Sequence, residues 1–431
     1  MTDRKMKDSG IEWIGEIPEG WKFEKGKYNF VNKKIIPGVN SVNYDRLSLT
    51  LKGVLKRSKD DSNGLQPKDF NTYQLLKKDE LVFKLIDLQN ISTSRVGLSH
   101  DIGIVSSAYI ILKNRKSIIP SYAEKFYLMM WHRNIFNALG DDGVRSSLSV
   151  TDLLNIKITI PPLPEQKSIA DFLDEKCGEI DGLTVDIEEQ IKILEEYKKS
   201  VITEAVTKGL NSNVEMKDSG IECVGTMPKK WEIKKVKYIS SFLFKGNGIT
   251  KEQVFEDGNI QCVRYGEIYT KYNNSFKKTI SLTKMNHILS PKHIQYGDIL
   301  FAGTGELIEE IGKNIVFLGN EPCLAGGDIV VLRHKQNPKF LNYALNSTYS
   351  QIQKSKGKAK LKVIHISATD IGNILISIPP IKEQKEIADY LDHKCSEIDS
   401  IISSKKQQLE TLAEYKKSLI YEYVTGKKEV A

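Results

Sequence analysis

The sequence has few cysteines and lacks any segment typical of a membrane protein. Its five cysteines show no C-x-x-C spacing, so we expect core packing rather than disulfides or a zinc site for Cys177, Cys223, Cys262, Cys323 and Cys395. No run of about 18 apolar residues occurs, and the opening residues, MTDRKMKDSG, are polar. We therefore expect a cytoplasmic protein with no membrane partner.

Common catalytic and metal-binding patterns are also missing. The sequence has no G-x-x-x-x-G-K-[ST] loop for ATP, and its seven histidines show no H-x-x-x-H spacing for a metal. FAGTGE (301–306) matches the F-x-G-x-G pattern of adenine methyltransferases, but the N/D/S-P-P-Y/F motif that such enzymes need is absent. A strand followed by a glycine turn explains FAGTGE more simply, so we expect no catalytic residues, no metal and no cofactor in this chain.

Length and charge set broad limits on what remains. A chain of 431 residues is long enough for two or three domains. The net charge of +8 favours nucleic acid as a partner, although many unrelated proteins share such an excess.

The dominant feature of the sequence is an internal repeat. One copy begins at Ile160 and reads IPPLPEQKSIADFLDEKCGEIDGL, followed later by LEEYKKSVITEAVTKG. The other begins at Ile378 and reads IPPIKEQKEIADYLDHKCSEIDSI, followed by LAEYKKSLIYEYVTGK. Matched residues are displaced by 218 positions (378 − 160). A repeat of this length indicates that the fold itself is built twice.

Each copy predicts one long helix with a narrow apolar stripe. The prolines end the preceding element, and the apolar residues then recur at steps of three and four. A stripe sustained over this length, roughly 40 residues or on the order of 60 Å, is typical of a coiled coil. The residues that we expect at the helix pairing are Ile169, Leu173, Cys177, Ile180, Leu183, Ile191 and Leu194 in the first helix, and Ile387, Leu391, Cys395, Ile398, Leu409 and Leu412 in the second.

Chain connectivity predicts that the two helices are antiparallel. MKDSGIEWIGEIPEGW near the start of the chain recurs as MKDSGIECVGTMPKKW at 216–231, directly after the first helix. A parallel pair would require this short link to return along the whole helix, whereas an antiparallel pair needs only a turn. The end of the second helix should then lie beside the first stub, with the chain ends less than about 30 Å apart.

Two dissimilar blocks, about 22–159 and 232–377, separate these repeated parts. Short β-rich runs occur at Glu80–Leu85, Ile102–Leu112, Ile156–Ile160, Asp298–Phe301 and Asp328–Leu332, and helices are expected at Tyr122–Phe136 and Pro338–Asn346. We expect an α+β fold with a pseudo-two-fold internal repeat, in which two globular α+β domains are separated by an antiparallel coiled coil. Its parts are residues 1–160, a first helix at 161–210, residues 211–378, and a second helix with the tail at 379–431.

Basic loops in the two blocks are the candidates for DNA contact. The run QIQKSKGKAKLKVI (351–364) carries five lysines and no acid, and GDDGVRSSLSV (140–150) occupies the equivalent place in the first half. Lysine and serine suit phosphate contact, and arginine can also read guanine. The candidates are Arg145, Ser146, Ser147, Lys354, Lys356, Lys358, Lys360, Lys362, Lys56, Arg57, Lys245 and Arg264. The alternative interpretation is a solvated loop for the loop residues and a half-buried strand for Arg264.

The repeated motifs together resemble the specificity subunit of type I restriction–modification enzymes. The resemblance rests on the PPLPEQ and PPIKEQ helix openings, the LEEYKKS and LAEYKKS helix ends and the MKDSGIEWIGEIPEGW stub, and it covers the whole chain. It implies two target recognition domains that read the halves of a split, asymmetric double-stranded DNA target, with the helices fixing the gap. It further implies that two methyltransferase subunits dock on the helices and that restriction (motor) subunits join them. S-adenosylmethionine, ATP and Mg²⁺ would belong to those partners.

Two other functions remain open at this point. A self-contained adenine-N6 methyltransferase would use FAGTGE and would bind S-adenosylmethionine by itself. A coiled-coil scaffold with no nucleic-acid role would show no salt-dependent binding to duplex DNA, since counterion release accompanies phosphate contact.

Overall fold

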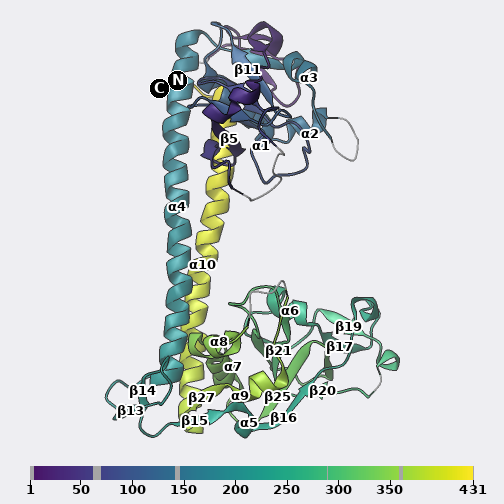
Figure 1. The fold of residues 1–431 in the computed structure, drawn as a ribbon, viewed down its shortest axis with the longest axis vertical. Helices are drawn as coiled ribbons and strands as arrows, with labels where there is room; N and C mark the ends of the chain where they lie inside the picture. The colour runs from purple at the N-terminus through teal and green to yellow at the C-terminus, as the bar shows by residue number, and fades with distance from the viewer. Residues whose placement is uncertain (1–3, 62–68, 141–145, 289, 359–362, 431) are drawn as a thin grey trace. The chain divides into compact units, whose positions relative to one another are not determined.

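The computed structural model describes residues 4–61, 69–140, 146–288, 290–358 and 363–430. The chain forms two compact units, each containing one block and half of each long helix (Figure 1). Unit 1 comprises residues 1–187 and 406–431, and unit 2 comprises residues 188–405. The long helices are α4 (Leu163–Lys208) and α10 (Ile381–Val424), and both pass from one unit into the other.

Unit 1 is built mainly of short strands. They are β1 (Met6–Asp8), β2 (Glu16–Pro18), β3 (Lys22–Lys25), β4 (Phe30–Asn32), β5 (Asp45–Thr50), β6 (Gly53–Arg57), β7 (Gln74–Leu76), β8 (Leu81–Phe83), β9 (Val96–Leu98), β10 (Gly103–Val105), β11 (Ile110–Asn114) and β12 (Lys157–Ile160). Its short helices are η1 (Gly26–Tyr28), η2 (Gly38–Asn43), α1 (Pro120–His132), α2 (Ile135–Leu139) and α3 (Val150–Asn155).

Unit 2 has the same mixed character. Its strands are β13 (Met216–Asp218), β14 (Thr226–Pro228), β15 (Glu232–Lys235), β16 (Ser240–Lys245), β17 (Ile260–Val263), β18 (Ser275–Phe276), β19 (Ser281–Thr283), β20 (His293–Ile294), β21 (Ile299–Ala302), β22 (Thr304–Gly305), β23 (Asn314–Phe317), β24 (Cys323–Ala325), β25 (Ile329–His334), β26 (Ile364–His365) and β27 (Leu375–Ile378). Its short helices are α5 (Val236–Ile239), η3 (Lys251–Gln253), α6 (Tyr265–Thr270), η4 (Met285–His287), α7 (Pro338–Asn346), α8 (Thr348–Ser355) and α9 (Ala368–Asn373).

The two blocks share a sheet topology despite their different sequences. The order β4-β11-β8-β9 in unit 1 corresponds to β16-β25-β21-β23 in unit 2. A second sheet in each unit contains one parallel pair, β5 with β10 and β17 with β24. The last strand of each block pairs antiparallel with the first, β12 with β3 and β27 with β15. The duplication therefore extends through the blocks, where their sequences had shown only a loose match.

A buried glutamine explains the helix-opening motifs. Gln166 is fully buried in the first turn of α4, where its side-chain amide donates to Pro161 O (2.9 Å) and accepts from Ile119 N (2.8 Å). Gln384 does the same in α10, donating to Pro379 O (2.8 Å) and accepting from Asn337 N (2.9 Å). Gln166 thus links α4 to the residue before α1, and Gln384 links α10 to the residue before α7. Because a buried amide must satisfy its hydrogen bonds, these contacts fix the start of each long helix against its own block.

The long helices pack antiparallel within each unit (Figure 1). In unit 1, Lys416 Nζ of α10 lies 2.6 Å from Asp181 Oδ1 of α4. The equivalent pair in unit 2 has the donor on the other helix, with Lys198 Nζ 2.6 Å from Asp399 Oδ1. The residue number in α4 rises from 181 to 198 while that of its partner in α10 falls from 416 to 399, so the helices are antiparallel as predicted. The matching pairs also confirm the pseudo-two-fold repeat.

The apolar stripe was largely but not wholly predicted. Ile169, Leu173, Cys177 and Ile180 are buried in unit 1, and Ile387, Leu391, Cys395 and Ile398 are buried in unit 2. Ile191, Leu194, Leu409 and Leu412 are half-buried.

Leu183 is wrong as a pairing residue, since 52% of it is exposed. Its neighbour Thr184 is the half-buried one, because a helix of 3.6 residues per turn drifts from a strict stripe. Lys405, a polar residue within the second helix, donates to Gln190 Oε1 of α4 (2.5 Å).

The described chain ends meet inside unit 1, as predicted. Arg4 Nη1 lies 3.3 Å from Glu429 Oε1, and its Nη2 lies 2.7 Å from Glu165 Oε1. Tyr421 of α10 donates to Ile14 O (3.3 Å) in the first stub. The second stub contacts α4 in the corresponding way, since Val224 lies in the same core cluster as Val201 and Ala205.

Several element boundaries differ from the predictions. The expected helix at 122–136 ends at His132, because Asn134 adopts a left-handed conformation (φ 57°) and is the N-cap of α2. The run at 102–112 forms two strands in different sheets, β10 and β11. Pro338–Asn346 is a helix as predicted.

The cysteines are free, and Cys223 is exposed rather than in a core. Within the described residues, no helix is long and apolar enough to span a bilayer.

Candidate nucleic-acid interface

A basic hollow of about 1000 Å³ lies in unit 2. Four basic side chains line it, Lys245, Lys251, Arg264 and Lys271, against the two acids Glu267 and Asp328. Both acids already face a base, since Arg264 Nε lies 3.2 Å from Glu267 Oε1 and Lys245 Nζ lies 3.5 Å from Asp328 Oδ1. Lys251 and Lys271 are exposed and form no ion pair with a described residue. The hollow therefore offers net positive charge to an anion such as a phosphate backbone.

Glu267 fixes the position of Arg264 at the start of α6. This carboxylate is buried and accepts hydrogen bonds from Arg264 N (3.1 Å), Arg264 Nε (3.2 Å) and Ser281 Oγ (2.5 Å). The two terminal nitrogens of Arg264 make no hydrogen bond to a described residue. A guanidinium held by its Nε keeps those donors available for phosphate or for a guanine edge. Tyr265, 40% exposed, adds an aromatic face to the same hollow.

Glycines shape one wall of this hollow. A Cβ on Gly246 would lie 2.3 Å from Gly326 O, and one on Gly327 would lie 3.1 Å from Gly248 Cα. The two glycine-containing segments approach each other too closely for side chains, which leaves bare backbone at the wall.

The lysine run after α8 is less uniform than its sequence implied. Lys354 is wrong as a DNA contact: it is 1% exposed and donates to Gly312 O (2.8 Å) and Asn314 Oδ1 (2.8 Å). Burial lowers the pKa of Lys354 to about 7. Lys358 pairs with Asp370 (2.9 Å), and Lys356 is exposed. The candidates Lys360 and Lys362 lie outside the described residues.

FAGTGE forms the end of β21, a turn and β22. Its glycines are needed because the chain's own atoms come close to them. A Cβ on Gly303 would lie 2.7 Å from Asp328 O, and one on Gly305 would lie 2.9 Å from the Tyr269 hydroxyl oxygen. The space beside both glycines is thus filled by protein, which favours the strand and turn over a cofactor loop.

In unit 1 the basic candidates gather on the β5–β6 hairpin. Lys56 on β6 is exposed, and Asp45 (3.1 Å) and Asp101 (3.4 Å) raise its pKa. Arg57 Nε lies 2.7 Å from Asp61 Oδ2. Burial raises the pKa of Tyr109, and the charges of Arg46, Arg57 and Arg95 partly oppose this shift.

The two serine candidates occupy different environments. Ser147 is exposed and forms a β-bridge with Ile86. Ser146 is wrong as a surface donor, because its side chain is buried and its Oγ has no hydrogen-bond partner among the described residues. Its carbonyl accepts from Leu88 N (3.2 Å). Arg145 lies outside the described residues.

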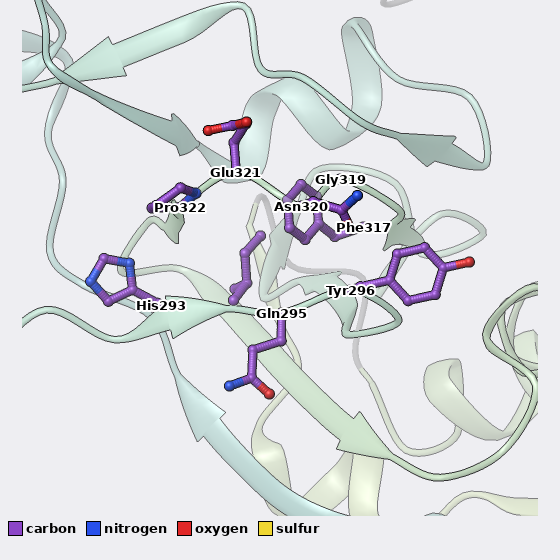
Figure 2. Close-up of a pocket in the computed structure, with 9 residues that line it drawn as sticks. His293, Gln295, Tyr296, Phe317, Gly319, Asn320, Glu321 and Pro322 are labelled. Carbon is purple, nitrogen blue, oxygen red and sulfur yellow. The ribbon is translucent and has the colours of Figure 1, made fainter.

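A second hollow in unit 2, of about 420 Å³, lacks the charge that DNA requires. Figure 2 shows its lining from two segments, His293 to Tyr296 and Phe317 to Pro322. It contains Glu321 but neither lysine nor arginine. It is therefore a poorer candidate for phosphate contact than the basic hollow.

Sequence reasoning missed part of the basic hollow. Lys271 and the Gly326–Gly327 wall were not singled out, because their proximity to Lys245 depends on pairing between strands that are distant in sequence, β16 with β25 and β17 with β24. The aromatic residues among bases at Arg264–Tyr272 were the available signal, and Tyr265 does line the hollow.

Comparisons with known proteins agree with the repeat. A family model described as "Type I restriction modification DNA specificity domain" matches residues 12–196 and again 228–411. The chain is 26% identical over 444 residues to a putative type I restriction enzyme MjaX specificity subunit of Methanocaldococcus jannaschii, covering 96% of this chain and 95% of that protein. It is 23% identical to the EcoKI specificity subunit of Escherichia coli, covering 90% and 84%.

Solved structures show the same fold. A chain from a type I R-M system aligns with a TM-score of 0.72 at 15% identity, covering 96% of this chain and 99% of that one. The HsdS subunit from Thermoanaerobacter tengcongensis aligns with a TM-score of 0.51 at 15% identity, covering 96% and 98%.

Proposed function

Because the chain belongs to the family of type I restriction–modification DNA specificity proteins, we propose that it reads a split, asymmetric DNA sequence and docks methyltransferase subunits. The specificity subunit is the non-catalytic component of such a system. The proposed partners are double-stranded DNA, two methyltransferase subunits and, through them, restriction subunits. The named relatives belong to Methanocaldococcus jannaschii and Escherichia coli, and we propose the cytoplasm as the location of the complex, where the DNA of such cells lies.

The observation that carries this proposal is that the stubs and long helices, here called the frame, occur twice, whereas the exposed loops of the two blocks differ. The contacts of Gln166 and Gln384 are equivalent, as are the ion pairs of Lys416 and Lys198. A frame present twice suits one kind of partner bound twice, because equivalent surfaces bind equivalent partners. The exposed loops differ between the halves, which supports two unlike half-sites.

The charge of the basic hollow in unit 2 supports duplex DNA as the ligand. Lys251 and Lys271 suit phosphate contact, whereas Arg264 suits base or phosphate. The described residues contain no cluster of metal-binding side chains, and the FAGTGE glycines are packed against the chain itself. As the family resemblance implies, we assign S-adenosylmethionine, ATP and Mg²⁺ to the partner subunits.

The test is methylome sequencing of cells that express the chain with its methyltransferase partners. We expect N6-methyladenine within one asymmetric two-part motif, and none when this chain is omitted. Calorimetry on the purified chain should show no binding of S-adenosylmethionine. Methylation by the chain alone, together with such binding, would replace the proposal with a self-contained methyltransferase.

A further inference from the structure

A buried arginine organises the loop that follows β8 in unit 1. Arg95 is fully buried, and its Nη2 donates to the backbone carbonyls of Asp87 (2.7 Å) and Asn90. Its Nη1 donates to Lys84 O (3.4 Å). One guanidinium thus binds carbonyls from three positions along the segment 84–90, a geometry that only arginine provides because its donors form a rigid planar fork.

Further contacts hold the backbone of this loop. Asp87 adopts a left-handed conformation (φ 54°), and Leu88 is buried with its N–H donating to Ser146 O (3.2 Å). Asn137 Nδ2 donates to Leu88 O (3.2 Å). The Asn90 side chain accepts from Ser92 N (2.9 Å), which closes a tight turn.

The side chains at the tip remain in solvent. Gln89 is exposed, and its amide makes no hydrogen bond to a described residue. Ile91 is 77% exposed, although it is a large apolar residue. The backbone of this loop is fixed before any ligand binds, so binding need not order it and loses less conformational entropy. The loop presents an unpaired amide beside an apolar side chain, which suits it to binding.

The second half places a comparable turn at the equivalent position. Residue 313, displaced from Arg95 by 218 (313 − 95), is Lys313, whose Nζ donates to Tyr269 O (3.4 Å). The bridge between Ile86 and Ser147 corresponds to the pairing of Thr304 with His365. At the tip, however, Gln89, Asn90 and Ile91 are replaced by Leu307, Ile308 and Glu309. The position of Arg95 is basic in both halves, although the contact of Lys313 is with Tyr269 of α6 rather than with its own loop. The tip residues differ, as expected for elements that read different sequences.

We propose that the loop 86–94 is a base-reading element of the first block, with Gln89 reading an adenine; this inference rests on the proposed function. A glutamine amide donates to adenine N7 and accepts from its N6 amino group in the major groove, and Ile91 suits contact with a thymine methyl group. Arg95 acts as a positioning residue through the loop backbone. Ser146 contributes its carbonyl to this support, while its buried Oγ forms no hydrogen bond with a described residue.

The experiment uses the full chain with its methyltransferase partners and methylome sequencing as the readout. Gln89→Ala should make one A·T position of the first half-site degenerate, with discrimination falling ~10-fold to ~100-fold, and should leave the second half-site unchanged. Gln89→Glu should move the preference at that position towards cytosine, whose N4 amino group donates to a carboxylate. Lys116→Ala, an exposed change outside the loop, is the matched control and should alter neither half-site.

Arg95→Lys tests the positioning role, because lysine keeps the charge but cannot bind the carbonyls as a fork. It should degrade the same position as Gln89→Ala while the second half-site stays intact. If both Gln89 variants fold, as judged by thermal unfolding, and yield the wild-type motif, the inference is wrong and the proposed function stands. If the wild-type chain directs no two-part motif, the proposed function itself is wrong.

Discussion

Replacing Gln166 tests why the helix-opening motif contains a glutamine. In Gln166→Ala the Ile119 N–H loses its acceptor, and the carbonyls of Pro161 and Ser117 lose their donors at 2.9 Å and 3.1 Å. The site is fully buried, so these groups cannot easily turn to water. Leaving buried backbone groups unsatisfied costs about 1–3 kcal/mol for each, partly relieved by relaxation, and we expect a net loss of about 3 kcal/mol.

For a unit of roughly 200 residues, that loss lowers the midpoint of thermal unfolding by about 6–12 °C. Differential scanning calorimetry measures this shift directly. Gln408→Ala is the control, since Gln408 is exposed on α10, and we expect it to change stability by less than about 0.5 kcal/mol. A Gln166→Ala midpoint within about 1 °C of the wild type would refute the role of Gln166 in fixing the start of α4.

Three further predictions concern the helices and the buried lysine. Lys198→Asp should weaken unit 2, and adding Asp399→Lys should restore part of the loss; a urea double-mutant cycle should give a coupling of about 0.5–1 kcal/mol, and zero coupling would contradict the pairing. Inserting four residues after Ile187 and after Lys405 adds about 6 Å to each helix and should lengthen the gap in the methylated motif, whereas altered half-sites would contradict the spacer role. Lys354→Met should flatten the pH dependence of stability: the pKa of Lys354 falls from 10.5 to about 7 on folding, so the unfolded state binds more protons and wild-type stability rises across that window. Urea midpoints at pH 7 and 9.5 that rise equally in both proteins would exclude this effect.

The long helices and their direction could be predicted because their signals are local and repeated. The apolar stripe recurs over the whole length of each helix, and the stub after Gly209 is too short for a parallel pair. The meeting of Arg4 with Glu429 followed from the same reasoning. Leu183 shows where prediction from the apolar stripe fails, since a one-residue difference in phase decides which side chain faces the partner helix.

Details of the candidate sites could not be predicted because they depend on contacts between distant segments. A lysine-rich run predicts a solvated Lys354, yet its ammonium is buried and donates to Gly312 O and Asn314 Oδ1. Likewise, Arg95 gave no sequence signal, because the carbonyls that it binds depend on the local path of the loop. Such burial is set by tertiary packing, which overrides the average preference of a residue type.

The most direct test of two-part recognition is to give the chain two identical blocks. Replacing residues 232–377 with residues 22–159 leaves the repeated frame in place and makes the halves alike. Because a two-fold protein reads an inverted repeat, methylome sequencing should then find a palindromic motif built from the first half-site alone. An unchanged asymmetric motif, with the variant chain assembled with its methyltransferase partners, would contradict recognition of each half-site by its own block.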